Sequence, residues 1–203
     1  INNNIDVYIN KEKIKIIKEN DQWKYNFKKE GNYNFEIIFN DNIKNMNGFF
    51  EKCSNIITLD FNILKYLLFK KGKVVENFCV YEENMEFFTE WLKQLFGETE
   101  GKEGVGIFPT STVHTRDLHS LGQFVQEGNK ILFETFLKVE EDDNYIDYEG
   151  RKLHEINNIV EDSVIRAHYS GGVPCMEIIL QKLDAETIAT MIYFFQLAAA
   201  YSG

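Results

Sequence analysis

Hydrophobic and polar positions follow two different rhythms from residue 63 to the end of the chain. Short runs rich in β-branched and aromatic residues favour strands, and the runs between them have the spacing of helices. Strands are expected at residues 73–81, 106–108, 131–139 and 175–180. This alternation predicts an α/β fold in which a mainly parallel sheet is covered by helices on both faces.

Three helices are predicted in the same region. The first, residues 85–96, carries an apolar stripe at i, i+3, i+4, i+7 spacing, made of Phe88, Trp91, Leu92 and Leu95. The second begins at Asp117, a favourable N-cap residue, and ends at Gly128, where a left-handed residue is expected. The third begins at Asp184, and its stripe, which is expected to be buried, contains Ile188, Met191, Ile192, Phe195 and Ala199.

The first 62 residues differ from the rest in composition. They contain 14 asparagines, against 6 in the following 141 residues, which predicts a domain boundary near Asn62. Strand-forming runs at 6–9 and 34–39, with a hairpin expected at 28–32, indicate a small β-rich module at 1–62. Residues 43–61 weakly resemble one unit of the leucine-rich-repeat-like surface proteins. A single repeat unit needs support from another part of the protein.

Charge and hydropathy exclude two classes of partner. The net charge of −10, from 32 acidic and 22 basic residues, repels nucleic acid and anionic lipid, so neither is expected as a partner. No apolar run approaches the roughly 18 residues of a membrane-spanning helix, so no membrane span is expected. An anionic substrate would need a local basic or dipolar pocket.

The cysteines indicate a reducing compartment. Cys53, Cys79 and Cys175 are far apart in the sequence and odd in number, so neither a zinc site nor a disulfide framework is predicted. The first twenty residues are interrupted by Asn and Lys and show no signal peptide, which leads us to expect a cytoplasmic protein. Because the chain begins with Ile, we expect it to be a piece of a longer one.

Candidate chemistry lies in the polar, glycine-rich stretch 97–128. Glu98 follows the predicted helix 85–96, so its side chain is expected near the negative end of that helix dipole. This end disfavours an ionised carboxylate, which makes the side chain a better proton acceptor, as a general base needs to be. His119 lies in the first turn of the next predicted helix, where a neutral imidazole is favoured. The alternatives are a surface acid and a histidine that packs locally. His114 and His168 are weaker candidates, and His154 is predicted to lie on a helix surface.

Several motifs in this half of the chain resemble one enzyme family. The stretch GETEGKEGVGIFPTSTVHTRDLHSLGQ and the later AHYSGGVPCMEI, with the segment between them, are similar to the bacterial branch of the glucose-6-phosphate isomerases over residues 63–203. The resemblance implies a sugar isomerase (SIS) fold, a three-layer αβα sandwich. It also implies interconversion of glucose 6-phosphate and fructose 6-phosphate through an enediolate, without a metal or an organic cofactor.

The same resemblance assigns roles to two residues. Glu98, in G-E-T-E-G-K, would move a proton between C2 and C1 of the opened sugar. His119, in D-L-H-S-L-G-Q, would assist ring opening or substrate handling. Family members work as homodimers whose sites borrow residues across the interface, so a homodimer that takes a sugar phosphate is expected.

This sequence also departs from the family. The lysine of the family's Q-x-G-V-E-x-x-K segment and the first SIS domain, which holds the substrate phosphate, do not occur in it. Two alternatives to an active isomerase therefore stay open. The chain could be an inactive remnant that binds a sugar phosphate or a protein, or its two segments could have been joined artificially near residue 62.

Overall fold

The structure, a computed structural model, describes residues 55–141 and 147–202 and the backbone of five N-terminal strands. Side chains are described from residue 61 onward. The N-terminal strands are β1 (Ile5–Ile9), β2 (Glu12–Lys13), β3 (Ile17–Glu19), β4 (Gln22–Lys24) and β5 (Phe35–Phe39). The later ones are β6 (Val75–Val80), β7 (Phe108–Val113), β8 (Leu132–Glu141), β9 (Asp147–Tyr148), β10 (Arg151–Lys152) and β11 (Cys175–Lys182).

The main sheet has seven strands in the order β2-β1-β5-β11-β8-β6-β7. The pairs from β5 to β7 are all parallel, and β1 and β2 add antiparallel strands at one edge. The predicted α/β class and mainly parallel sheet are thus confirmed. Strands were correctly predicted at 73–81, 131–139 and 175–180. The expected strand at 106–108 is wrong in extent, because β7 begins at Phe108 and continues to Val113.

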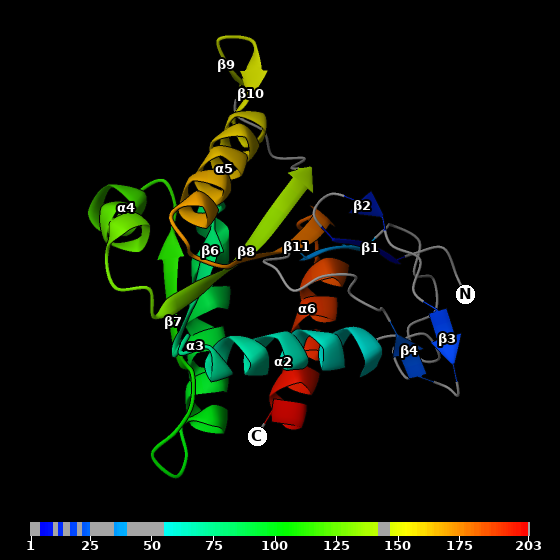
Figure 1. The fold of residues 1–203 in the computed structure, drawn as a ribbon. Helices are drawn as coiled ribbons and strands as arrows, with labels where there is room; N and C mark the ends of the chain where they lie inside the picture. The colour runs from blue at the N-terminus through cyan, green and yellow to red at the C-terminus, as the bar shows by residue number, and fades with distance from the viewer. Residues whose placement is uncertain are drawn as a thin grey trace.

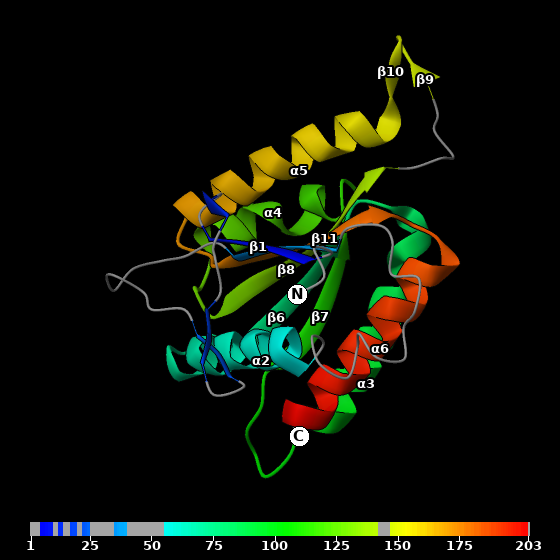
Figure 2. The ribbon, with the colours of Figure 1, turned by 90° about the vertical axis from the view of Figure 1, so that its right-hand side faces the viewer.

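Five α-helices of the described chain cover the sheet on both faces. They are α2 (Asn55–Lys70), α3 (Glu86–Glu100), α4 (Leu118–Glu127), α5 (Leu153–Ser170) and α6 (Ala185–Ser202), and a short 3-10 turn at Glu83–Met85 precedes α3. Figures 1 and 2 show α4 and α5 on one face and α2, α3 and α6 on the other. The result is a three-layer αβα arrangement.

Side-chain alternation in β6 explains why both faces are covered. Successive side chains of a strand point to opposite faces, so Phe78 and Val80 face α2, α3 and α6, whereas Cys79 faces α4 and α5. All three are fully buried. A strand that is apolar on both sides must be sandwiched between helix layers, as parallel sheets generally are.

Phe195 of α6 lies at the centre of the larger core. Its ring lies 5.0 Å from Phe194 and about 6 Å from four further rings, which belong to Phe61, Phe78, Phe88 and Phe96. These rings come from α2, β6, α3 and α6. A single aromatic side chain therefore joins three helices to the sheet.

The predicted helix boundaries hold with several corrections. Helix α3 continues past residue 96 to Glu100, so Glu98 lies within the helix and not after it. Gly128 ends α4 at φ −75, in extended and not left-handed backbone. Asp184 caps α6 by accepting a hydrogen bond from Thr187 N at 2.8 Å. The stripe of α6 is buried at Met191, Phe195 and Ala199, whereas Ile192 is 37% exposed and was wrongly assigned to the core.

The structure describes only part of the β-rich module predicted at residues 1–62. Strands β1 and β5 coincide with the runs at 6–9 and 34–39, and β5 pairs in parallel with β11 of the main sheet. The hairpin at 28–32 and most of the repeat-like stretch 43–61 lie outside the described residues. Helix α2 runs without a break across Asn62. The division of the chain into 1–62 and 63–203 stays a prediction.

In the part of the chain that the structure describes, no helix is both long and apolar enough to cross a membrane.

A buried acid lies between α5 and the sheet. Glu161 is 1% exposed, and its Oε1 has no hydrogen-bond partner among the described residues. Burial raises the pKa of Glu161 to about 8, and the nearby negative charge of Glu177 adds to this, while Lys138 offsets part of it. The folded protein therefore holds a proton on this side chain more tightly than the unfolded chain does.

Replacing Glu161 with Gln should change how stability depends on pH. A raised carboxyl pKa contributes stability that is complete below the ordinary value of 4.5 and is lost as the pH rises through about 8. Gln cannot ionise, so the melting temperature of E161Q minus that of the wild type should rise by about 10 °C between pH 5 and pH 8.5. The exposed Glu155 on the same helix gives the control E155Q, for which this difference should not change. An E161Q difference that is equal at both pH values would contradict the assignment.

Truncating Phe195 should open a cavity that the helices cannot close. We expect F195A to lose roughly 3–5 kcal/mol of unfolding free energy, which lowers the melting temperature by about 10 °C. Phe87, on the surface of α3, is 82% exposed, so F87A should stay within about 0.5 kcal/mol of the wild type. Urea denaturation followed by circular dichroism measures both, and equal losses would contradict the central role of Phe195.

Candidate functional site

The G-E-T-E-G-K motif forms the last turn of α3 and the start of the loop that follows. Gly97 lies against β7, and a Cβ there would meet the Pro109 ring at 3.7 Å. Thr99 Oγ1 donates to the carbonyl of Leu95 at 2.7 Å, one helical turn back. Gly101 then ends the helix. The motif is thus held by its own helix and by the edge strand of the sheet.

A tight turn leads from α3 back to the sheet. Val105 N donates to Lys102 O at 3.0 Å, and Glu103 and Gly104 both have positive φ, which closes a two-residue hairpin. Gly106 has φ +139, and a Cβ at this position would lie 2.5 Å from the carbonyl oxygen of Glu100. Only glycine permits this close approach, so the loop 101–107 is packed directly onto the end of α3.

A buried ion cluster supports the same turn from inside. Lys65 of α2 contacts Glu76 Oε2 at 2.8 Å and Glu100 Oε1 at 3.0 Å, and its ammonium lies 3.7 Å from the centre of the Phe96 ring. Thr135 donates a hydrogen bond to Glu76 Oε1 at 2.8 Å. Burial raises the pKa of Glu76, and the ammonium of Lys65 offsets part of that effect.

A recess of about 600 Å³ opens beside the motif. Its wall consists of the middle of α2, the end of α3, the loop 101–107 and the end of α6. Thr99, Lys102 and Tyr201 line it, together with Asn62, whose buried Oδ1 accepts no hydrogen bond within the described residues. The recess therefore combines aromatic surface with a cation and a hydroxyl group, a composition suited to a small polar ligand.

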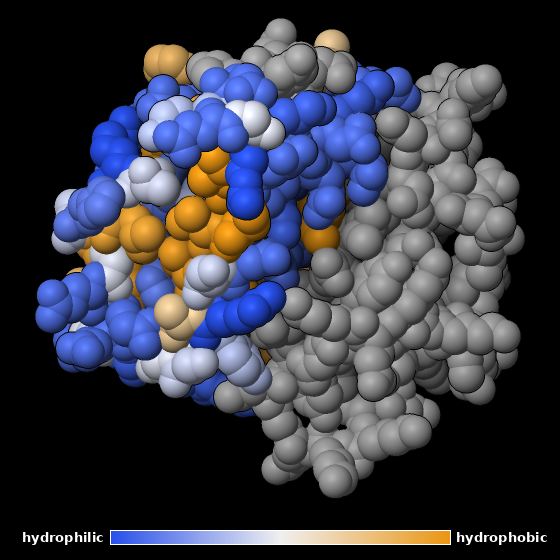
Figure 3. Space-filling view, turned by 90° about the horizontal axis from the view of Figure 1, so that it is seen from above, coloured by the Kyte–Doolittle hydropathy of each residue, from blue (hydrophilic) through white to orange (hydrophobic). Residues whose placement is uncertain are grey.

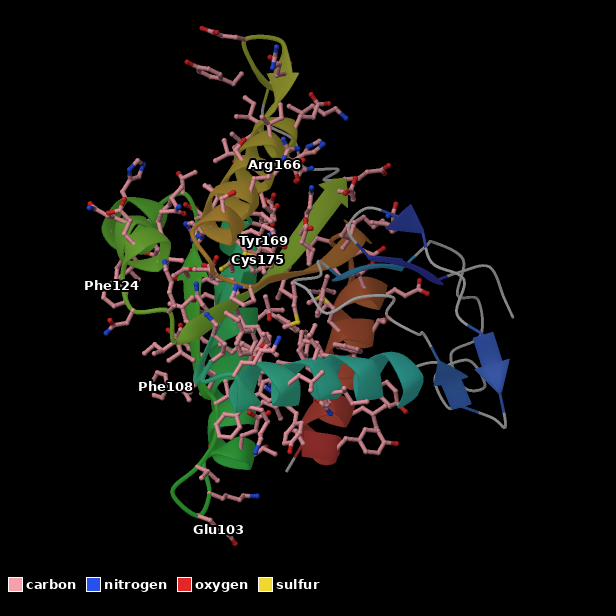
Figure 4. All side chains as sticks on the ribbon, viewed as in Figure 1. Glu103, Phe108, Phe124, Arg166, Tyr169 and Cys175 are labelled. Atoms are coloured by element: carbon pink, nitrogen blue, oxygen red, sulfur yellow. The ribbon has the colours of Figure 1, made fainter. Side chains whose placement is uncertain are left out.

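Glu98 lies next to this recess and not in its wall. Its side chain is exposed and accepts a hydrogen bond from Gln94 Nε2 at 3.2 Å, while Thr99 and Glu100 line the recess. Glu103, at the tip of the following loop, marks this end of the molecule in Figure 4. Glu98 thus remains open to any group that approaches from outside the chain.

His119 is found at the other end of the sheet. It lies in the first turn of α4 and is exposed. Arg116, just before this helix, pairs with Glu86 in the first turn of α3 at 2.9 Å. Glu98 is twelve residues farther along α3, or about 18 Å. Strand β7, which is about 17 Å long, separates the two segments in the sequence, so one chain does not bring Glu98 and His119 together.

The N-terminus of α4 is held in an unexpected way. Asp117 was predicted to cap the helix, but its side chain caps none of the helix N–H groups. Its Oδ2 instead accepts a hydrogen bond from Val113 N at 2.7 Å, at the end of β7. This contact ties the His119 segment to the sheet edge.

The other histidines have structural surroundings. His168 of α5 pairs through Nδ1 with Glu134 of β8 at 2.7 Å, and both are buried. His114 packs against the rings of Tyr81 and Phe136, and burial lowers its pKa. His154 is 8% exposed, so the prediction of a helix-surface residue is wrong.

Sequence reasoning missed the ion cluster. Phe61, Lys65 and Leu68 recur at helical spacing and are all buried, so Lys65 occupies a core position of α2. The sequence offered two signals: a lysine on an apolar helix stripe and a glutamate inside the β-strand run VENFCV. Both positions are expected to be buried, and buried charges must be paired.

Within residues 61–141 and 147–202, no group of three or more metal-binding side chains is arranged to hold an ion.

Relatives of known activity cover much of this chain. The glucose-6-phosphate isomerase of Staphylococcus aureus strain Mu3 is 41% identical over 166 residues, which is 75% of this chain and 38% of that protein. The isomerase of strain Newman matches to the same extent. Three quarters of 203 residues is about 152, more than the 141 residues from 63 to 203, so the similarity begins within the Asn-rich segment. No protein-family model matches the chain.

Solved structures share the fold. A hypothetical protein of Thermus thermophilus superposes with a TM-score of 0.67 at 18% identity, over 72% of this chain and 39% of its own. A glucose-6-phosphate isomerase from Chlamydia trachomatis gives 0.62 at 17% identity, over 76% and 34%. The chain spans 38% of the length of the curated relatives that it matches. Over three quarters of its own length it is similar to part of a glucose-6-phosphate isomerase, and the resemblance to that family noted in its motifs is confirmed.

Proposed function

We propose that this chain is the part of a glucose-6-phosphate isomerase that carries the proton-transferring glutamate. The observation that carries the proposal is the G-E-T-E-G-K turn, where Glu98 is exposed at the end of α3 and beside a recess of about 600 Å³. The identity of 41% with enzymes of that name supports it. The substrate would be a hexose 6-phosphate.

In the proposed reaction, Glu98 acts as the general base. Its carboxylate takes the proton from C2 of ring-opened glucose 6-phosphate, which leaves an enediolate, and returns that proton to C1 to give fructose 6-phosphate. A second proton moves from O2 to O1, so the atoms balance and no oxidant is needed. A positioned base of this kind contributes roughly 10²- to 10⁴-fold to the rate.

His119 would reach this site from a second copy of the chain. Since Glu98 and His119 lie at opposite ends of β7 within one chain, a shared site requires a homodimer. Exposed apolar side chains near His119 offer a surface for pairing, because Leu121 is 48% and Phe124 is 54% exposed on α4. Figure 3 shows apolar side chains gathered on the face formed by α4 and α5. Patches of this kind often mark protein interfaces.

One observation favours a second candidate, a binding module without turnover. Glu98 does not line the recess, whereas Asn62, Thr99 and Lys102 do. Such a recess could hold a sugar phosphate without placing the carboxylate over its carbons. The two candidates differ in whether the substrate exchanges its C1 hydrogen.

The first test follows proton transfer directly. The chain is incubated with fructose 6-phosphate in D₂O, and loss of the C1 proton signal and formation of glucose 6-phosphate are followed by NMR. Gln keeps the shape of Glu but cannot accept the proton, so E98Q should lower both rates by at least about 10²-fold. Glu90, an exposed acid on the same helix, provides the control E90Q, which should retain the wild-type rates.

The binding-module candidate predicts a different result. Fructose 6-phosphate would then shift the NMR signals of the recess residues without any exchange at C1 in the wild type. Exchange that E98Q leaves unaltered would refute the role of the glutamate.

The shared site can be tested by mixing two inactive variants. In a heterodimer of E98Q and H119Q, one of the two sites receives Glu98 from one chain and His119 from the other, so it is intact. Random reassociation should therefore restore about a quarter of the wild-type activity. Activity that stays at the level of the separate variants, although mass spectrometry detects heterodimers, would place both residues within one chain's site or outside catalysis.

A further inference from the structure

The ion cluster around Lys65 combines deep burial with contacts to three elements. Its side chain is 3% exposed, and those of Glu76 and Glu100 are 1% and 9% exposed. Lys65 comes from α2, Glu76 from β6 and Glu100 from the last turn of α3. One ammonium thus joins the end of α3 to the sheet.

The sheet side of this cluster is fixed. Glu76 accepts from Lys65 through Oε2 and from Thr135 of β8 through Oε1, so both of its oxygens are bonded. Val75 and Glu76 pair in register with Leu132 and Phe133 of the same neighbouring strand. Lys65 is therefore anchored to two paired interior strands of the parallel sheet.

The other side of the cluster reaches the proposed catalytic turn. Glu100 is bonded to Lys65 through its side chain, and its carbonyl accepts from Lys102 N at 2.9 Å and lies against Gly106. Glu98 is two residues earlier in the same helical turn. Whatever fixes Glu100 also fixes the backbone that carries Glu98 and the wall of the recess.

We propose that Lys65 is a positioning residue for this site, because it clamps Glu100 to the sheet and so holds the last turn of α3 in place. The proposal rests on the proposed function for its link to catalysis. Without the ammonium, the Glu100 carboxylate would be a buried, unpaired charge that gains free energy by turning out into water. The turn 97–100 and the loop 101–107 would then loosen together, although both are far from residue 65 in the sequence.

A positioning role predicts a specific kinetic signature. Displacing a general base by about 1 Å can cost about 10²-fold in rate, while groups that bind the substrate elsewhere are unaffected. Loss of Lys65 should therefore lower kcat by about 10- to 100-fold, and KM should change by a smaller factor, because only the part of the recess wall formed by 97–107 loosens. A residue that only stabilises the fold would leave kcat per folded molecule unchanged.

The test must separate positioning from folding. K65M alone leaves two buried acids without a counter-ion and is expected to unfold readily. In the double variant K65M/E76Q the acid facing the sheet is neutral as well, so stability should largely recover while Glu100 still lacks its clamp. Conservative K65R, which keeps the positive charge, should restore part of kcat. Lys93, at the surface of α3, gives the matched control K93M.

Amide hydrogen exchange, measured by mass spectrometry on the full chain, reports on the turn without requiring turnover. In K65M/E76Q, exchange over residues 97–107 should rise at least about tenfold relative to the wild type and K93M, while exchange in β8 stays the same. Unchanged exchange over 97–107, or a kcat equal to that of the wild type, would overturn the proposal. If the wild type shows no turnover, the proposed function fails, and the exchange measurement still decides whether Lys65 holds this segment.

Discussion

The burial of both faces of the parallel sheet is the constraint on which the rest of this structure depends. A strand such as β6, with Phe78 on one side and Cys79 on the other, needs a helix layer above and below it. Helix α3 therefore covers one face and α4 the other, and β7 connects them. Glu98 at the end of α3 and His119 at the start of α4 must then lie at opposite ends of that strand. Their separation follows from the topology and not from the details of any loop, and a site that uses both needs two chains.

The parts of the fold that could be predicted are those in which local pattern and burial agree. Strands β6, β8 and β11 are largely buried and rich in apolar residues, and the stripe of α3 centred on Leu92 repeats at helical spacing, so the hydrophobic pattern located all four. The motifs around Glu98 and His119 identified candidate residues by resemblance to a family. Periodicity carries no information about the distance between two elements, so the sequence could not reveal that these candidates lie far apart.

The features that the sequence analysis missed depend on packing partners from other helices and strands. Strand β7 has the sequence FPTSTV, with polar side chains and a proline, which an edge strand tolerates and an interior strand does not. Its short apolar start at Phe108 was all that a hydrophobic pattern could detect. The burial of His154 and Ile192 was predicted wrongly. A residue at the edge of an apolar helix stripe is buried or exposed according to the element that packs against the helix, which the stripe itself does not reveal. Lys65 was overlooked because its partners come from β6 and α3, eleven and thirty-five residues away.

The buried charges show how the two helix layers are assigned to their faces. Glu76 and Glu134 lie on neighbouring strands, and their side chains point to opposite faces of the sheet. Each is matched by one basic side chain from a helix, Lys65 of α2 on one face and His168 of α5 on the other. Buried ion pairs add little net stability, but an unpaired buried charge is costly, so they penalise every arrangement that separates the partners. Docking α5 on the face of Glu76, or α2 on that of Glu134, would leave a buried polar side chain without its partner. The pair that aligns α2 also reaches Glu100, so the feature that specifies the fold on this face is the same one that holds the proposed catalytic turn.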